Sequence, residues 1–140
     1  NCPIKFAKCC NPLPGDEIVG FITRGFGVSI HKKDCANARA GMAGEDSARW
    51  LRAWWAEKAS EKETFKSSLE ISAMDRDGLM ADVAGLIAEM HLPCYAISAR
   101  QLADGRATMA LTIGVNNTEH LNTVIARLRK IKSITTITRV

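Results

Sequence analysis

Apolar residues follow two different periods along this chain, and the change between them predicts two modules. In the first sixty residues the apolar runs are short and are separated by glycine- and proline-containing segments. Short runs bounded by turn residues are typical of strands. From residue 65 onward, alternating runs and stretches with a 3.6-residue spacing follow one another. The pattern indicates an α+β protein with a small β-rich module at 1–60 and a mixed module at 61–140.

The first module is predicted to be a small sheet with one short helix. Its predicted strands are residues 3–8, 17–23, 28–31 and 49–55. Glycines at 24–27 suit a hairpin reversal between the second and third strands. Asp34 is a good N-cap for an alanine-rich helix at 35–42. The Trp-rich run suits a strand that closes the sheet edge.

The second module is predicted to alternate strands and helices in the order β-α-β-β-α-β. The strands are predicted at 65–73, 94–102, 107–115 and 133–140, and the helices at 79–90 and 118–130. Asp77 is expected to cap the first helix and residues 116–118 to supply a turn and a cap for the second. Asp104-Gly105 is a signal for a two-residue hairpin.

This order is the split βαβ pattern of ferredoxin-like folds. Right-handed crossovers place both helices on one face of a four-stranded antiparallel sheet and leave the other face uncovered. Apolar residues on an uncovered face require a partner. We therefore expect the second module to form a homodimer. The charged segment 57–64 is interpreted as the linker between the modules.

Composition agrees with a globular protein. The chain has 140 residues, 46% of them hydrophobic and 24% charged. No apolar run approaches the length of a membrane-spanning helix. The chain begins with Asn rather than Met, so we expect a piece of a longer protein. Five cysteines without a secretory signal favour reduced thiols and a cytoplasmic location.

Three thiols and one imidazole are the first candidates for chemistry. They are Cys9, Cys10, His31 and Cys35. Four such ligands suit a tetrahedral structural zinc site. The spacing is not the common Cys-x-x-Cys pattern, so small buried cysteines are an equal alternative. Adjacent cysteines bind one ion only if the backbone turns near Asn11-Pro12. Cys2 is a less favoured ligand, and Cys94 is expected in the core.

The sequence offers no clear catalytic site. We find no P-loop and no Gly-x-Gly-x-x-Gly segment that opens a helix. Cys9 or Cys10 with His31 is the remaining candidate pair. A nucleophile, however, needs one activated thiol rather than three clustered ones. We therefore expect that this fragment is not an enzyme.

The net charge of +4 arises mainly in the first module, which has nine Lys and Arg against six Asp and Glu. The basic candidates for RNA contact are Arg24 in the hairpin reversal and Lys32 and Lys33 after His31, with Lys5 and Lys8 in support. Phe26 is a candidate for base stacking. A solvated basic surface is the alternative, and composition alone favours it.

The stretch from Cys9 to Cys35 also resembles a known domain. The matching segments are Cys9-Cys10-Asn-Pro, Pro14-Gly15-Asp16, Gly20-Phe21, Thr23-Arg24-Gly25, Gly27-Val-Ser-Ile-His31 and Asp34-Cys35. They resemble the conserved-cysteine, ribosome-intersubunit (zinc-finger) domain of long RelA/SpoT-type enzymes, which make and degrade the alarmone (p)ppGpp. The resemblance implies contact with ribosomal RNA and tRNA and favours zinc.

The second module resembles the ACT domain that follows in those enzymes, through residues 75–79, Asp104-Gly105 and 118–130. ACT domains commonly bind small amino acids at dimer interfaces. Here the carboxylate would lie at a helix N-terminus, and Asp75 or Asp77 would hold the ammonium group. The predicted ligand residues are Asp75, Arg76, Asp77, Gly78, Leu79, Met80, Ile97 and Ser98.

The resemblance implies a regulatory C-terminal fragment of a bifunctional (p)ppGpp synthetase/hydrolase. The parent would be a GTP diphosphokinase and guanosine-bis(diphosphate) 3'-pyrophosphohydrolase. In this interpretation a branched-chain amino acid such as valine or isoleucine binds the ACT module and controls alarmone metabolism in the stringent response. A ribosome- and tRNA-docking module without a small ligand is the alternative. A pure dimerisation unit is a third.

Overall fold

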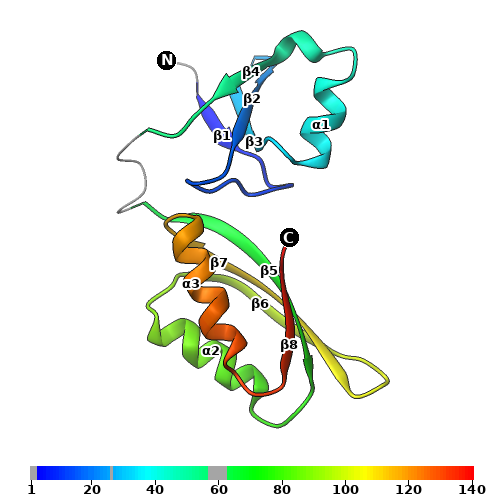
Figure 1. Ribbon diagram of the computed structural model, residues 1–140, viewed down its shortest axis with the longest axis vertical. Helices are drawn as coiled ribbons and strands as arrows, with labels where there is room; N and C mark the ends of the chain where they lie inside the picture. Colours follow the sequence, from blue (N-terminus) through cyan, green and yellow to red (C-terminus); the bar gives the residue numbers. More distant parts are fainter. Residues whose placement is uncertain (1–2, 26, 57–62) are drawn as a thin grey trace. The chain divides into compact units, whose positions relative to one another are not determined.

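The computed structural model describes residues 3–25, 27–56 and 63–140. Contacts within the chain divide it into two units, Asn1–Lys62 and Glu63–Val140 (Figure 1). Most of the predicted linker, residues 57–62, lies outside the described residues. No helix in the described residues is long and apolar enough to cross a membrane.

The first unit is a four-stranded sheet in the order β1-β3-β2-β4. Its elements are β1 (Ile4–Phe6), β2 (Ile18–Thr23), β3 (Gly27–Lys32), α1 (Ala36–Met42), the 3-10 turn η1 (Ser47–Arg49) and β4 (Trp50–Ala53). β1 pairs parallel with β3, and β2 pairs antiparallel with both β3 and β4. All four predicted strands are therefore confirmed, with β1 and β4 at the two edges.

The reversal between β2 and β3 requires glycine, because its backbone has positive φ values and one position lies against β1. Gly25 and Gly27 have φ values of 79° and 99°, a region that side-chain-bearing residues rarely adopt. A Cβ at Gly27 would lie 2.1 Å from the carbonyl oxygen of Pro3, so β1 can approach only a glycine there. The predicted hairpin is confirmed. Phe26, proposed as a stacking residue, lies outside the described residues.

The short helix α1 begins one residue later than its predicted cap. Cys35, not Asp34, is the N-cap, with extended φ and ψ of −61° and 133°. Asp34 is wrong as the cap because it precedes the N-cap by one residue, and its exposed carboxylate lies 3.7 Å from the Lys32 ammonium group. The shift leaves Cys35 at the turn into the helix, where its thiol reaches the other candidate ligands.

The second unit is the predicted ferredoxin-like fold. Its elements are β5 (Phe65–Met74), α2 (Leu79–Glu89), β6 (Cys94–Gln101), β7 (Arg106–Val115), α3 (Thr118–Arg129) and β8 (Ile134–Arg139). The strand order is β6-β7-β5-β8, and every neighbouring pair is antiparallel. Both helices cover the same face of the sheet (Figure 1).

Strict alternation sends the large apolar residues of this sheet to the helix side. Leu69 and Ile71 of β5 and Met109 and Leu111 of β7 are at most 1% exposed. The opposite face carries hydroxyl residues, including Ser68 and Thr112, whose oxygens lie 3.1 Å apart. The expectation of an apolar uncovered face is therefore wrong for this unit. Exposed apolar side chains of the second unit's sheet are Met74 and Tyr95, whereas the first unit's sheet exposes Ile4, Phe6, Ile22 and Leu51.

Two turn predictions in the second unit are corrected and one is confirmed. The N-cap of α2 is Gly78 with φ of 81°, because the left-handed turn favours glycine over Asp77. The N–H of Leu102 bonds the carbonyl of Arg106 at 2.8 Å, so the hairpin loop is 103–105 rather than two residues. Asn117 caps α3 by accepting a bond from the His120 N–H at 2.8 Å.

Candidate metal centre and ligand cavity

The three thiols and the imidazole predicted as metal ligands come together in the first unit. The ligand atoms of Cys9, Cys10, His31 and Cys35 all lie within 4.8 Å of one another. The Cys9 sulfur is 3.5 Å from Nδ1 of His31 and 3.6 Å from the Cys35 sulfur. The Cys10 sulfur is 3.9 Å from the same imidazole nitrogen. One ion can therefore be reached by all four side chains after small movements.

A backbone turn lets two adjacent cysteines face the same point. Residues 8–10 form a turn that follows β1. The N–H of Asn11 closes the turn by bonding the carbonyl of Ala7 at 2.9 Å, and Asn11 itself has φ of 44°. Asn tolerates this left-handed conformation better than most residues. His31 arrives from β3 and Cys35 from the start of α1.

The surroundings of the thiols differ. Burial raises the pKa of Cys10 to about 12, although the Lys32 N–H donates to its sulfur at 3.3 Å. Burial also acts to raise the pKa of Cys35. Donation from the Ala38 N–H, the Cys9 thiol and the Asn37 N–H nevertheless lowers it overall. Burial lowers the pKa of His31, which favours the neutral imidazole that a metal requires.

The donor set fits zinc. Three sulfurs and one imidazole form a Cys₃His set, which is used by structural zinc sites. The second nitrogen of His31, Nε2, lies 3.5 Å from the Ser29 hydroxyl. The His31 ring also packs against Trp50, with centroids 5.4 Å apart. Such contacts fix the orientation of a ligating histidine.

A separate cavity of about 430 Å³ lies in the second unit, where α2 begins. All six residues predicted from 75 to 80 line it: Asp75, Arg76, Asp77, Gly78, Leu79 and Met80. The other two predicted residues, Ile97 and Ser98, do not. Instead β6 contributes Ala99, Arg100 and Gln101, and β7 contributes Ala107 and Met109. The cavity therefore meets β6 two residues beyond the predicted Ile97.

Hydrogen bonds distinguish two roles among the predicted ligand residues. The Asp75 carboxylate accepts a bond from the side-chain amide of Gln101. The Arg76 guanidinium donates to the Lys132 carbonyl at 3.1 Å and pairs with Asp82 at 2.6 Å. Arg76 therefore holds the turn before α2 to neighbouring segments. Asp75 and Asp77 are the acidic residues that line the cavity, together with an apolar floor formed by Met109 and Ala107, which are 1% and 3% exposed.

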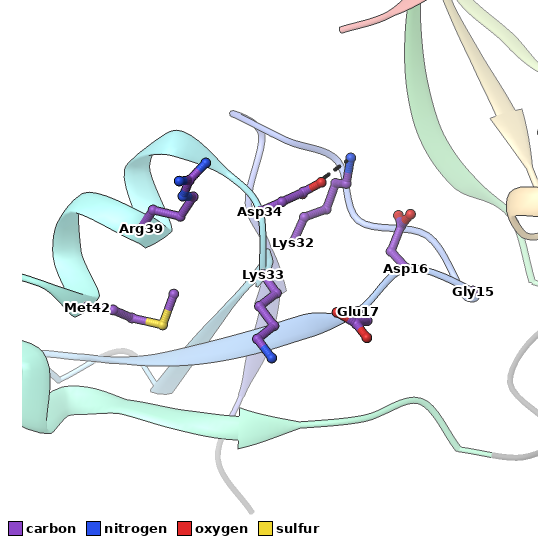
Figure 2. Close-up of a pocket in the computed structure, with 8 residues that line it drawn as sticks. All are labelled: Gly15, Asp16, Glu17, Lys32, Lys33, Asp34, Arg39 and Met42. Carbon is purple, nitrogen blue, oxygen red and sulfur yellow. Dashed lines mark ion pairs between the residues drawn. The ribbon is translucent and has the colours of Figure 1, made fainter.

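The basic candidates for RNA contact lie at opposite ends of the β2–β3 hairpin. Lys32 and Lys33 line a cavity of about 570 Å³ together with Arg39 (Figure 2). Asp16, Glu17 and Asp34 line the same cavity, so its charge is mixed. Arg24 follows the Thr23–Gly27 pair, whereas Lys32 pairs with Ile18. The two ends are roughly 16 Å apart at about 3.3 Å per residue.

The remaining cysteine predictions have different outcomes. Cys94 is wrong as a core residue, because it is exposed at the start of the edge strand β6. Cys2 lies outside the described residues.

Comparisons with known proteins match both units. The family model described as the RelA/SpoT RIS domain matches residues 1–56, and one described as an ACT domain matches residues 61–139. The chain is 31% identical over 137 residues to a GTP pyrophosphokinase of Streptomyces coelicolor, covering 98% of this chain and 16% of that protein. It is 32% identical over 136 residues to the bifunctional (p)ppGpp synthase/hydrolase RelA of Mycobacterium tuberculosis, covering 97% and 18%.

A solved structure also matches the second unit. The crystal structure of the ACT domain from a GTP pyrophosphokinase of Chlorobium tepidum is 28% identical, with a TM-score of 0.50. The match covers 56% of this chain and 100% of that domain. The chain spans less than a fifth of the length of the two curated relatives above.

Proposed function

The chain belongs to the RelA/SpoT family, with a RIS domain and an ACT domain, and from this we propose that it regulates an enzyme of (p)ppGpp metabolism. The parent would be a GTP pyrophosphokinase that also hydrolyses its product. The fragment itself would be a sensor without catalytic groups. The cavity beside α2, which has an acidic residue next to an apolar floor, is the observation that supports a small-molecule sensor.

A free aliphatic amino acid matches the chemistry of this cavity. Its carboxylate would lie at the start of α2, where the first backbone N–H groups lack helical partners and the helix dipole favours negative charge. Its ammonium group would pair with the Asp75 carboxylate, which Gln101 orients. Its side chain would contact Leu79, Met109 and Ala99. A floor of this kind favours branched aliphatic side chains such as those of valine and isoleucine.

A second copy would complete the site. β6 is an edge strand, and its outer backbone groups have no partner strand within this sheet. Ala99 and Gln101 of β6 line the cavity, so a copy that pairs along β6 would cover its open side. We therefore propose a homodimer through the ACT domain. A ligand held between two copies would change the activity of the parent if it binds one dimer arrangement more tightly than the other.

Calorimetric titration tests this function. Valine, isoleucine and leucine are titrated into the protein, and aspartate and lysine serve as controls whose charged side chains do not suit the apolar floor. We expect measurable binding of at least one branched-chain amino acid and none of the controls. Heats equal to buffer dilution for all three would overturn amino-acid sensing.

RNA docking is the alternative function for the first domain. Lys33 and Arg39 support it. Both line the cavity of about 570 Å³ that acidic residues also line, yet neither forms an ion pair among the described residues (Figure 2). Unpaired cations on strand and helix ends suit phosphate contact. Ribosomal RNA and tRNA would be the partners. Binding that falls steeply with salt is the expected signature.

Structural zinc is the proposed cofactor of the first domain. Cys9, Cys10, His31 and Cys35 would hold it, and no catalytic step is assigned to it. A bound ion would tie the turn after β1 to β3 and α1. Zinc would in this way stabilise the segment 32–34, which lies between two of its ligands and carries the basic residues.

A further inference from the structure

We propose that Cys9 and Cys35 form a reversible disulfide when the metal-free cluster meets a peroxide. The cluster would then be a site of oxidative modification as well as a candidate metal centre. The disulfide rests on the positions of the sulfurs alone. Its competition with zinc rests in addition on the zinc site proposed above.

Distance and exposure select these two thiols. The sulfurs of Cys9 and Cys35 are 3.6 Å apart, closer than those of Cys9 and Cys10 at 4.0 Å. Cys9 is exposed, whereas Cys35 is intermediate and Cys10 is buried. An oxidant in solution therefore reaches Cys9 first. Cys35 is then within reach of the oxidised sulfur after a small movement.

Backbone geometry disfavours the pair formed by Cys9 and Cys10. Consecutive Cα atoms are 3.80 Å apart across a trans peptide. Ordinary disulfides join residues whose Cα atoms are about 4.4–6.8 Å apart. The Cys10 sulfur is also farther from Cys9, at 4.0 Å, and it accepts the Lys32 N–H. Cys9 and Cys35 belong to different segments, the turn after β1 and the start of α1, and are free of this restriction.

The chemistry needs one molecule of hydrogen peroxide. The Cys9 thiolate attacks one peroxide oxygen, the O–O bond breaks, and the departing hydroxide takes a proton to become water. This gives a sulfenic acid on Cys9. The Cys35 thiolate then attacks the Cys9 sulfur and expels the hydroxide, which is also protonated to water. Two thiols are oxidised by two electrons, and the peroxide is reduced to two molecules of water.

The modification would change the cluster as a metal site. It removes two of the four ligands, and Cys10 with His31 alone cannot hold zinc with structural affinity. The disulfide also joins the turn after β1 directly to α1. A thiol reductant reverses the step and restores all four ligands.

Peptide mapping can test the disulfide directly. The protein carries Cys2→Ser and Cys94→Ser, so that only cluster thiols remain, and it is stripped of metal with a chelator. After one equivalent of hydrogen peroxide, trypsin places Cys9 and Cys10 on the peptide 9–24 and Cys35 on the peptide 34–39. We expect the two peptides to be linked, with a combined loss of two hydrogen atoms, and to separate on reduction.

Two further variants assign the bond. Cys10→Ser should retain the linked peptides, whereas Cys9→Ser should lose them. A loss of two hydrogens within the peptide 9–24 alone, or a link that survives Cys9→Ser, would overturn the proposal. Circular dichroism verifies that each variant is folded. Pre-loading with zinc should slow the reaction. If the protein does not bind zinc, the proposed zinc site is wrong. The disulfide is still tested, because its experiment uses the metal-free protein.

Discussion

The side-chain amide of Gln101 donates a hydrogen bond to the carboxylate of Asp75, which connects the edge strand β6 to the segment that follows β5. Both residues line the cavity at the start of α2. The bond orients the carboxylate and leaves further acceptor positions for a ligand. This relationship makes Asp75 the residue on which the proposed amino-acid site most depends.

Asp75→Asn should weaken valine binding by about tenfold or more. The change removes the charge that attracts the ammonium group, and hydrogen bonds to charged groups contribute about 1.5–3 kcal/mol. Calorimetry measures the change in Kd. Asp104→Asn is the matched control, because Asp104 pairs with Arg106 in the β6–β7 loop outside the cavity. Equal affinities for the two variants would exclude Asp75 as a ligand residue.

Ala99→Leu should abolish amino-acid binding while leaving the unit folded. Ala99 is exposed and lines the cavity, so a larger side chain fills the space without displacing the core. Ala110→Leu is the control, since Ala110 lies next to Ser98 on the uncovered face of the sheet. Unchanged valine binding by Ala99→Leu, with an unchanged melting temperature, would place the ligand elsewhere.

Periodicity predicted the strands and helices of the second unit, because burial on one face imposes regular spacing, whereas α1 and β4 of the first unit were predicted from their composition. The errors in where helices begin lie at turns. Gly78 rather than Asp77 caps α2, since the required left-handed φ outweighs side-chain capping there. Cys35 replaces Asp34 because α1 begins one residue later than predicted, and the Asp34 carboxylate pairs with Lys32 instead.

The metal cluster was predictable from residue types, but the separation of the basic residues was not. Cys9 and Cys10 can share one ion only because of the turn closed by Asn11. Arg24 and Lys32 are close in sequence, yet the hairpin register places them at opposite ends. That Ala99 and Gln101 rather than Ile97 line the cavity likewise depends on how the start of α2 meets the sheet, a tertiary relationship that no local pattern contains.

Lys33→Ala should weaken binding to ribosomal RNA and reduce the slope of log K against log salt by about one, the effect of losing one phosphate contact. Lys32→Ala should have a smaller effect, because Lys32 is already paired with Asp34. Lys66→Ala is the control, since that ammonium group lies over the Tyr95 ring in the second unit. Filter binding at several salt concentrations measures all three. An unchanged slope for Lys33→Ala would remove Lys33 as a contact.

Gly41→Ala should destabilise the first unit by about 1–3 kcal/mol, the usual cost of overpacking. An added Cβ would lie 2.5 Å from Cζ2 of Trp50, which packs against both His31 and Phe21. Gly85→Ala, in α2, is the control, and we expect it to raise stability rather than lower it. Nothing lies within 4 Å of its added Cβ, so it should stabilise the second unit by about 1 kcal/mol. Urea denaturation of each variant measures both effects.

Removal of zinc should destabilise the first unit and leave the second unchanged. A ligand present at one hundred times its Kd stabilises the folded state by about 2.7 kcal/mol. Near-ultraviolet circular dichroism would report the change, because Trp50 packs against the candidate ligand His31. Zinc affinity should rise with pH, since metal binding must displace the proton that burial holds on Cys10, whose pKa is raised to about 12.

Metal analysis of two variants tests whether the four side chains of the cluster hold the zinc. His31→Ala removes a candidate ligand and should lower bound zinc from one equivalent to well below it. Cys94→Ser removes an exposed thiol outside the cluster and should retain one equivalent. If both variants bind the same amount of zinc, the ion is not held by these four side chains. A chelator that leaves the Trp50 signal unchanged would show that the unit folds without any metal.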